Sequence, residues 1–264
     1  MLSGKQPFNI FTRGGRSGYK PLIAVPLTDS DVEAVQSLEG AHIAELRLDM
    51  FSSLNRLLDS YYVDHIISTC KEKFGLPVLA TCRAKEEGGS HYVPDSSRKD
   101  ILISASHKAD AIDVEINSAI APLVVSALRA STAKTVTDTS AAVTDTAAVV
   151  TDTAATIVLS YHDFEKTPQM STLIEVYEKG KSLGADIIKI AAMARTMDDL
   201  RVLTRFILDH SGSGINDIVV IAMGEMAMSS RLFFPLIGSL FTFASLNTRT
   251  APGQLSLEDV TKFF

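Results

Sequence analysis

One lysine, Lys189, lies within the apolar run GADIIKIAAMA at residues 184–194. A buried ammonium without a partner is costly, and burial shifts the equilibrium towards the neutral amine. A neutral amine is a nucleophile that forms an imine with a ketone or an aldehyde. The structural alternative is that Lys189 belongs to a buried ion pair. The run therefore makes Lys189 the first candidate for covalent chemistry.

Charged and polar side chains alternate with apolar ones along several other runs. In AELRLDM, the side chains of Glu45, Arg47 and Asp49 share one face of a predicted strand, because alternate residues of a strand point the same way. The same spacing recurs at Thr81 and Arg83, at Asp113, Glu115 and Asn117, and at Ser160 and His162. A solvated face of an antiparallel sheet would show this pattern too, and His162 alone could be a structural histidine. At the carboxyl ends of parallel barrel strands, the same positions would form an active site.

The elements that would position these residues repeat along the chain. Short β-branched runs, each followed by a stretch with helical spacing, begin at residues 21, 41, 76, 110, 156, 185, 217 and 239. Eight such units with no leftover strand favour a closed barrel over an open sheet. The length of 264 residues is close to the roughly 250 residues of one such barrel. The sequence therefore predicts an α/β fold, a single (β/α)8 TIM barrel spanning residues 1–264.

Two segments depart from this repeat. Residues 1–20 contain FNIFTRGGRSGYK, which predicts an N-terminal β-hairpin covering one end of the barrel. Residues 131–155 form a low-complexity insertion in which VTDT recurs with a seven-residue period. A coiled-coil seam is disfavoured because the second seam position is Thr. We interpret the insertion as an extension of the fourth helix or a mobile loop.

Composition excludes several other classes of function. The formal charge of −6 lacks the basic stripe that nucleic-acid binders need, so we expect no nucleic-acid partner. No apolar segment is long enough to span a bilayer, and the start of the chain lacks a secretory signal. Cys70 and Cys82 lack CxxC spacing. We expect a cytoplasmic protein with no membrane contact, and no metal site, because His and Cys are not clustered.

Seven motifs follow one another along nearly the whole chain. They are ELRLDMF at Glu45, TCRAKEEGG at Thr81, DVEIN at Asp113, SYHDFEKTP at Ser160, DIIKIA with Lys189, SSR ending in Arg231 and APGQ ending in Gln254. Each motif alone is weak, but seven in order are a strong signal. The sequence closely resembles the type I 3-dehydroquinate dehydratases, the Schiff-base-forming lyases of the shikimate pathway.

The resemblance implies a role for each matching residue. Lys189 matches the imine-forming lysine, and His162 matches the general acid/base. Glu87 matches the glutamate that holds this histidine. Substrate-contacting positions of the family match Glu45, Arg47, Arg83, Arg231, Thr250 and Gln254. Arg231 is expected to hold a carboxylate through two parallel hydrogen bonds.

The implied reaction is the dehydration of 3-dehydroquinate to 3-dehydroshikimate. No cofactor is expected, because the imine itself serves as the electron sink. The expected partner is this small-molecule substrate. A homodimer is compatible with the sequence, which does not define the oligomeric state.

Three positions depart from the family pattern. Thr250 stands where serine is frequent, and it keeps the hydroxyl while adding a methyl group. Pro26 stands near a position that often carries a small hydroxyl residue, so one polar contact is expected to be missing. Ala227 replaces a glycine, which is acceptable where its φ is negative.

Two alternative functions fit parts of the pattern. Another lysine-imine barrel enzyme, such as an aldolase acting on a phosphorylated sugar, would need a Gly-rich phosphate cradle after strands seven and eight. This chain has MGEMAMSSR and TRTAPGQ there. A non-catalytic barrel within a multi-enzyme assembly would have no use for Lys189, His162 and Glu87 together.

Overall fold

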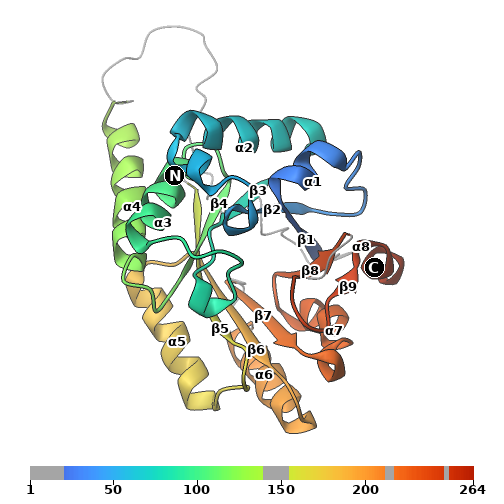
Figure 1. Cartoon of the computed structure of the whole chain (residues 1–264). Coiled ribbons are helices and arrows are strands. Elements are labelled where there is room, and N and C mark those ends of the chain that lie inside the picture. The colour runs from blue at the N-terminus through green and yellow to red at the C-terminus, as the bar shows by residue number, and fades with distance from the viewer. Residues whose placement is uncertain (1–20, 139–154, 212–216, 247–249) are drawn as a thin grey trace, which may run out of the picture.

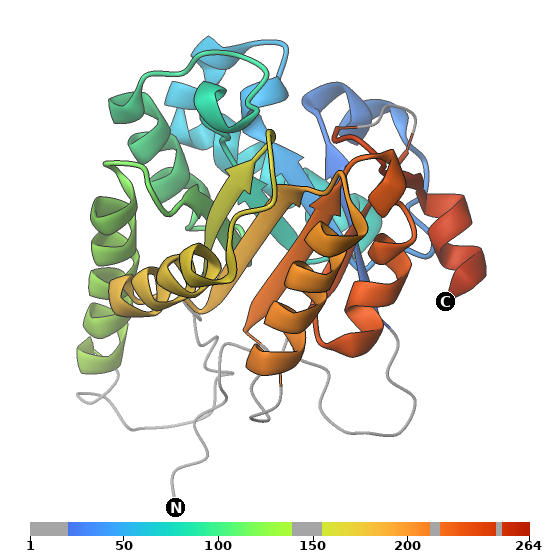
Figure 2. The ribbon, with the colours of Figure 1, turned by 90° about the horizontal axis from the view of Figure 1, so that it is seen from below.

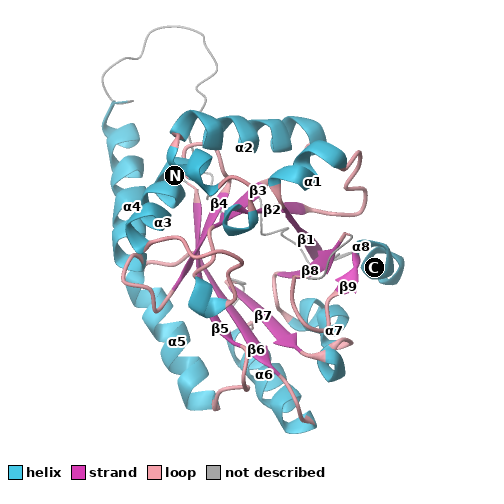
Figure 3. Cartoon of the chain, in the orientation of Figure 1, coloured by secondary structure: helices cyan, strands magenta, loops and turns pink. Residues whose placement is uncertain are grey.

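The computed structural model describes residues 21–138, 155–211, 217–246 and 250–264. Within them, helices surround a curled sheet (Figures 1 and 3). The strands are β1 (Leu22–Leu27), β2 (Ile43–Arg47), β3 (Val78–Thr81), β4 (Ala111–Glu115), β5 (Thr156–Asp163), β6 (Ile187–Met193), β7 (Ile218–Met223), β8 (Phe241–Ser245) and β9 (Leu255–Ser256). The helices are α1 (Asp29–Ala34), α2 (Ser60–Phe74), α3 (Asp95–Ala105), α4 (Ala121–Asp138), α5 (Met170–Leu183), α6 (Met197–His210), α7 (Ser230–Ile237) and α8 (Leu257–Phe263). Short 3₁₀ turns are η2 (Leu48–Met50), η3 (Leu54–Leu58), η4 (Lys85–Glu87) and η5 (Glu225–Ala227).

The strands are parallel and follow the order β7-β6-β5-β4-β3-β2-β1-β8-β9. This order confirms the predicted α/β fold and all eight predicted βα units. Between β7 and β8 the described residues form no strand ladder, so the sheet curls like a barrel with one seam. At this seam Leu240 N donates to Ile218 O (2.9 Å), and Ser239 Oγ accepts from Val220 N (3.0 Å). The sequence predicted a fully closed barrel. Instead, individual hydrogen bonds, one of them to the hydroxyl of Ser239, join β7 and β8 at this seam.

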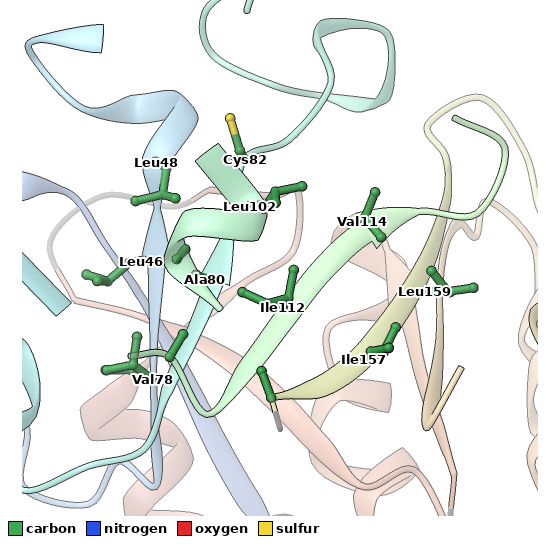
Figure 4. Close-up of a cluster of buried hydrophobic side chains, with 14 of the residues drawn as sticks. Leu46, Leu48, Val78, Ala80, Cys82, Leu102, Ile112, Val114, Ile157 and Leu159 are labelled. Carbon is green, nitrogen blue, oxygen red and sulfur yellow. The ribbon is translucent and has the colours of Figure 1, made fainter. Parts of the chain in front are cut away.

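Alternate residues of each strand face two separate cores. Outward side chains pack against the helices, as Figure 4 shows for Leu46, Ala80, Ile112 and Leu159 together with Leu102 of α3. Inward apolar side chains form a second cluster inside the barrel, and four of them (Ala191, Ile221, Met223 and Phe243) also line the cavity described below. The cluster comprises Leu22, Ala24, Ile43, Leu79, Ala111, Val158, Ile187, Ala191, Val219, Ile221, Met223, Leu240, Phe241 and Phe243. On β2, β4 and β5 the inward positions become polar towards the carboxyl ends, as the alternation predicted, whereas those of β7 stay apolar.

Aspartates at the strand starts hold neighbouring strands in register. Asp110, just before β4, donates its N–H to Val78 O (2.9 Å), and its carboxylate accepts from Val78 N (2.8 Å). Asp186, just before β6, repeats both bonds with Ile157 of β5. Helices outside the sheet add a cation, since Arg129 of α4 pairs with Asp186 at 2.6 Å. Figure 2 shows these helices lying along the outside of the strands.

Two predicted segments lie largely outside the described residues. The N-terminal hairpin falls entirely within residues 1–20. Of the low-complexity insertion, residues 139–154 are also outside. Helix α4 extends to Asp138 and so includes the start of the first VTDT. No helix in the described ranges is both long and apolar enough to cross a bilayer.

Candidate active site

A cavity opens at the carboxyl ends of the strands and brings together all nine candidate residues. Its lining comprises Glu45, Arg47, Arg83, Glu87, Gly88, His162, Phe164, Lys189, Ala191, Ile221, Met223, Arg231, Phe243, Thr250, Ala251 and Gln254. These residues come from the strands β2, β5, β6, β7 and β8, from the segments that follow β3, β5 and β8, and from α7. The barrel thus assembles side chains that are up to 209 positions apart in the chain, from Glu45 to Gln254.

Lys189, on the inner face of β6, is 5% exposed. Its Nζ donates to Asp113 Oδ2 (2.9 Å) and lies 3.9 Å from Glu45 Oε1. The same nitrogen sits 4.6 Å from the centre of the Phe243 ring. Lys189 therefore belongs to a buried ion pair with Asp113, as the structural alternative for this lysine predicted. A paired ammonium is not a nucleophile, so any reaction at Nζ requires the loss of a proton first.

Asp113 of β4 is the centre of the charge network. Its Oδ1 accepts from Ser160 Oγ (2.6 Å) and lies 2.9 Å from Arg83 Nη2, and the residue is 1% exposed. Burial alone would raise the pKa of Asp113, but the positive charges of Arg83 and Lys189 have a larger combined effect and bring this pKa well below its usual range. Asp113 is therefore ionised and holds two cations on opposite oxygens.

His162 of β5 is joined to Glu87 of η4. Glu87 Oε2 is 3.0 Å from His162 Nδ1 and accepts from the backbone N of His162 (3.1 Å). Burial lowers the pKa of His162, and the charges of Arg83 and Lys189 lower this pKa further, against an opposing effect of Asp113. The imidazole is therefore neutral at physiological pH and suited to accept a proton. Because Glu87 holds Nδ1, Nε2 is the nitrogen that can exchange a proton.

Glu87 has an unusually high pKa for a carboxyl group. The pKa of Glu87 is raised to about 7, chiefly because burial disfavours the charged carboxylate. Arg83 and the backbone N–H of His162 lower this pKa, while Glu115 and Asp113 raise it by smaller amounts. The pair of Glu87 and His162 thus changes its charge near neutral pH.

Arg231 of α7 is a buried cation that has no carboxylate partner among the described residues. It is 2% exposed, and its Nη2 donates to Pro252 O (2.9 Å). Its Nε has no hydrogen-bond partner within the described part of the chain. Burial lowers the pKa of Arg231 to about 10. A buried guanidinium with a free donor at the cavity wall is suited to bind an anion.

Gln254 offers a second unused donor beside Arg231. Its Oε1 accepts from Thr250 N (2.7 Å) and Thr250 Oγ1 (3.2 Å), which fixes the orientation of the amide. Its buried Nε2 has no partner among the described residues. Thr250 therefore orients Gln254 through its hydroxyl, a bond that serine could equally make.

Several buried polar residues bond to the candidate residues, although the sequence alone predicted no function for them. Asp113, Glu115 and Ser160 were placed at strand ends by their alternation, and the structure adds what they bind. Asp49 of η2 was likewise on the charged face. Its carboxylate holds Arg47 through two bonds (2.9 and 2.8 Å) and also accepts from the backbone N of Arg83 and of Ser90. It thereby ties the segment carrying Glu87 to β2.

The other two departures from the family pattern have simple surroundings. Pro26 of β1 lines a cavity next to the site, together with Thr28, Arg47 and Thr250. Ala227 is buried in the turn η5, where a helical backbone conformation suits alanine.

Comparison with known proteins agrees with this geometry. A family model described as Type I 3-dehydroquinase matches residues 22–264. The chain is 36% identical over 246 residues to the 3-dehydroquinate dehydratase of Thermodesulfovibrio yellowstonii, which covers 92% of this chain and 94% of that protein. The chain belongs to the type I 3-dehydroquinase family. Members of the type I 3-dehydroquinase family are hydro-lyases, and this assignment replaces the aldolase and the non-catalytic alternatives.

Solved structures of type I 3-dehydroquinases have the same fold. The 3-dehydroquinate dehydratase of Aquifex aeolicus has a TM-score of 0.70 and 28% identity, covering 92% of this chain and 96% of that chain. The Geobacillus kaustophilus enzyme has a TM-score of 0.72 and 24% identity, covering 93% and 90%. The curled parallel sheet is therefore the fold of the family.

Proposed function

We propose that this chain dehydrates 3-dehydroquinate to 3-dehydroshikimate through an imine on Lys189, with His162 as general acid and base. The relatives are named for this substrate. The observation that carries the mechanism is the position of Lys189. Lys189 lines the cavity, on the strand next to His162, and its Nζ donates to the Asp113 carboxylate 2.9 Å away.

Substrate binding would use the unpaired donors at the cavity wall. The carboxylate of the substrate would take the free Nε of Arg231, and a ring hydroxyl would take Nε2 of Gln254. Arg47, Arg83, Glu45 and Thr250 would complete the contacts to the hydroxyl groups. Both donors are buried and lack an acceptor within the described part of the chain, so the site should prefer a polar, anionic ring that can accept both hydrogen bonds over an apolar ring.

Imine formation needs a neutral amine and a proton acceptor. Lys189 would lose a proton to the neutral imidazole of His162, on the adjacent strand, and then attack the C3 ketone as a neutral amine, giving a carbinolamine. The carbinolamine would then take up a proton and lose water to leave a protonated imine. The positive imine attracts electrons from the adjacent C2–H bond, which makes that proton acidic.

Elimination would use the same imidazole twice. Nε2 of His162 would take the proton from C2, and the electrons of that bond would move into the imine to form an enamine. The resulting imidazolium would protonate the C1 hydroxyl, which leaves as water while the electrons return to form the conjugated imine. Hydrolysis of this imine would release 3-dehydroshikimate and free Lys189. Glu87 would hold the imidazole orientation in both steps.

Borohydride trapping tests the imine directly. Reduction in the presence of dehydroquinate should give a mass adduct on the wild type and none on Lys189→Met, while Lys179→Met, at an exposed lysine outside the cavity, should be trapped normally. Formation of the conjugated product, followed by ultraviolet absorbance, should occur in the wild type and be abolished in Lys189→Met. An adduct that persists in Lys189→Met would overturn the assignment.

We also infer the setting of the enzyme from its sequence. An acidic chain acting on a small metabolite is expected in the cytoplasm, without a nucleic-acid partner. A homodimer remains a prediction, which light scattering of the purified full chain would test.

A further inference from the structure

Arg98 is the largest fully buried side chain of the described residues, and it lies on α3, outside the strand wall of the site. Its Nε donates to Cys82 O (3.0 Å) at the end of β3. One terminal nitrogen pairs with Asp95 at 2.7 Å, and the other pairs with Glu115 of β4. A buried guanidinium on a covering helix is therefore bonded through the strand wall to a carboxylate of an inner strand position.

Glu115 binds both Arg98 and Arg83, and so links α3 to the active site. It is 1% exposed, and its second oxygen accepts from Arg83 Nη1 (2.9 Å) and from Ala84 N (2.8 Å). The other terminal nitrogen of Arg83 is bonded to Asp113, which holds Lys189. Five buried charges of alternating sign thus run from α3 to the nucleophile: Arg98, Glu115, Arg83, Asp113 and Lys189.

We propose that Arg98 is a positioning residue that neutralises Glu115 and so keeps Arg83 shared between Glu115 and Asp113. This inference rests on the proposed function. If Glu115 lost Arg98, its uncompensated charge would draw Arg83 away from Asp113, because charges interact strongly in a site shielded from water. Asp113 would then hold Lys189 more tightly, and Lys189 would release its proton less readily.

Loss of Arg98 should also favour the protonated form of His162. The charges that face His162 are Arg83, Lys189 and Arg47, which disfavour the imidazolium, and Asp113, which favours it; Glu87 binds Nδ1. Lys189 itself faces Asp113 and Glu45. Without Arg98, the network carries one more net negative charge. The imidazolium would be favoured, and the base would be lost at a higher pH than in the wild type.

The experiment is the pH dependence of kcat/KM on dehydroquinate for the full chain. In Arg98→Met the acid limb should move up by about one pH unit, which lowers kcat/KM about tenfold at pH values below the limb. Glu115→Gln removes the negative charge between Arg98 and Arg83, leaves Arg98 paired with Asp95 alone, and should move the limb down. The double variant Arg98→Met/Glu115→Gln, which removes the pair together, should return the limb towards the wild-type position. A merely structural role would not produce opposite shifts that cancel.

The matched control is Arg129→Met, which removes another arginine that joins a helix to the sheet, through Asp186 at the far end of the barrel. Its pH profile should equal that of the wild type. If folded Arg98→Met has an unshifted profile, the proposal is overturned. If Arg98→Met does not fold, the comparison of Glu115→Gln with the double variant decides, and equal profiles for these two overturn it. A wild type that forms no conjugated product would instead refute the proposed function.

Discussion

Arg231 combines two costs that a ligand could relieve. Among the described residues, its buried guanidinium has no counter-ion, and one of its donors has no hydrogen-bond partner. The pKa of Arg231, lowered by burial to about 10, reflects the cost of keeping this charge away from water. Residues that are unfavourable for folding but suited to a ligand are typical of binding sites.

Arg231→Met should therefore raise stability while it impairs binding. Removing an uncompensated buried charge and keeping an apolar side chain of similar length should raise the unfolding free energy by about 1–3 kcal/mol. KM should rise by roughly a hundredfold, because a charge-assisted contact to the substrate carboxylate is lost. Urea denaturation and steady-state kinetics measure the two effects. Arg205→Met, at an exposed ion pair, should change neither, and lower stability of Arg231→Met would contradict the argument.

Glu87 makes the stability of the wild type depend on pH with a sign unusual for a carboxylate. Its pKa is about 7 in the folded state, above its ordinary value of 4.5, because burial disfavours the charge. Between these values the folded state binds a proton that the unfolded state has lost. Its contribution to stability is therefore complete below about pH 4.5 and is lost as pH rises through 7.

Glu87→Gln removes this dependence. Relative to the wild type, the unfolding free energy of Glu87→Gln should increase between pH 5 and 8 by on the order of 2 kcal/mol. His162, whose pKa is lowered in the folded state, has the opposite pH dependence, but it is present in both proteins. Urea denaturation at the two pH values gives the difference. A pH-independent difference would show that Glu87 is ionised throughout.

The sequence predicted which face of each strand carries the polar residues. It did not predict which of these residues bond to one another. Alternation in DVEI placed Asp113 and Glu115 inside the barrel, because a strand has a period of two. The pairing of Asp113 with Lys189 joins residues 76 positions apart, and only the curvature of the sheet determines it. Arg98 lies in a polar stretch of α3 that looks like a solvated helix face. The burial of such a residue depends on packing that local sequence does not encode.

At the scale of elements, the aspartates before β4 and β6 act as register clamps. Each one exchanges two bonds with the neighbouring strand and also receives a cation from a helix. A slip of one residue in register would turn the inward side chains outward, so these clamps indirectly position Asp113 and Lys189. They lie at the amino-terminal end of the barrel, opposite the cavity.

Asp186→Ala should therefore cost stability without a specific loss of activity. The change leaves the buried N–H of Ile157 without its acceptor and the guanidinium of Arg129 with Gly184 O alone, which should lower the unfolding free energy by about 1–3 kcal/mol. Asp186→Asn keeps an acceptor and should lose less than half as much. Thermal unfolding compares the variants, while kcat/KM of the folded fraction should stay within about twofold of the wild type. Equal losses for Ala and Asn would mean that charge alone matters.

At the scale of the whole molecule, the seam between β7 and β8 is closed differently at its two ends. At the amino-terminal end Ser239 bonds to Val220. At the catalytic end, the loop after β8 lies over the seam, where Pro252 O accepts from both Gly224 N (3.3 Å) and Arg231. The βα repeats predicted the strand order, but the repeats contain no signal for this seam. The site is therefore completed by a loop contact as much as by the sheet.

Gly253 permits this contact, and Gly253→Ala tests its importance. Gly253 has φ +69°, and an added Cβ would lie 2.2 Å from Gly224 O, so the loop must move away from β7. Gly75, at the end of α2, has a similar φ of +65° with open space around it. Both alanine variants should lose about 1 kcal/mol of stability from the left-handed backbone.

Only Gly253→Ala should lose activity. Displacing Arg231 and Gln254 from the substrate should lower kcat/KM by about a hundredfold, since misplacement of about 1 Å has effects of this size. Gly75→Ala should retain wild-type kinetics. Borohydride trapping at saturating dehydroquinate should persist in both variants, because Lys189 and Asp113 lie on β6 and β4 rather than on the loop. Loss of trapping in Gly253→Ala would show that the loop also positions the nucleophile, and unchanged kinetics would show that closure of the seam at this end does not contribute to turnover.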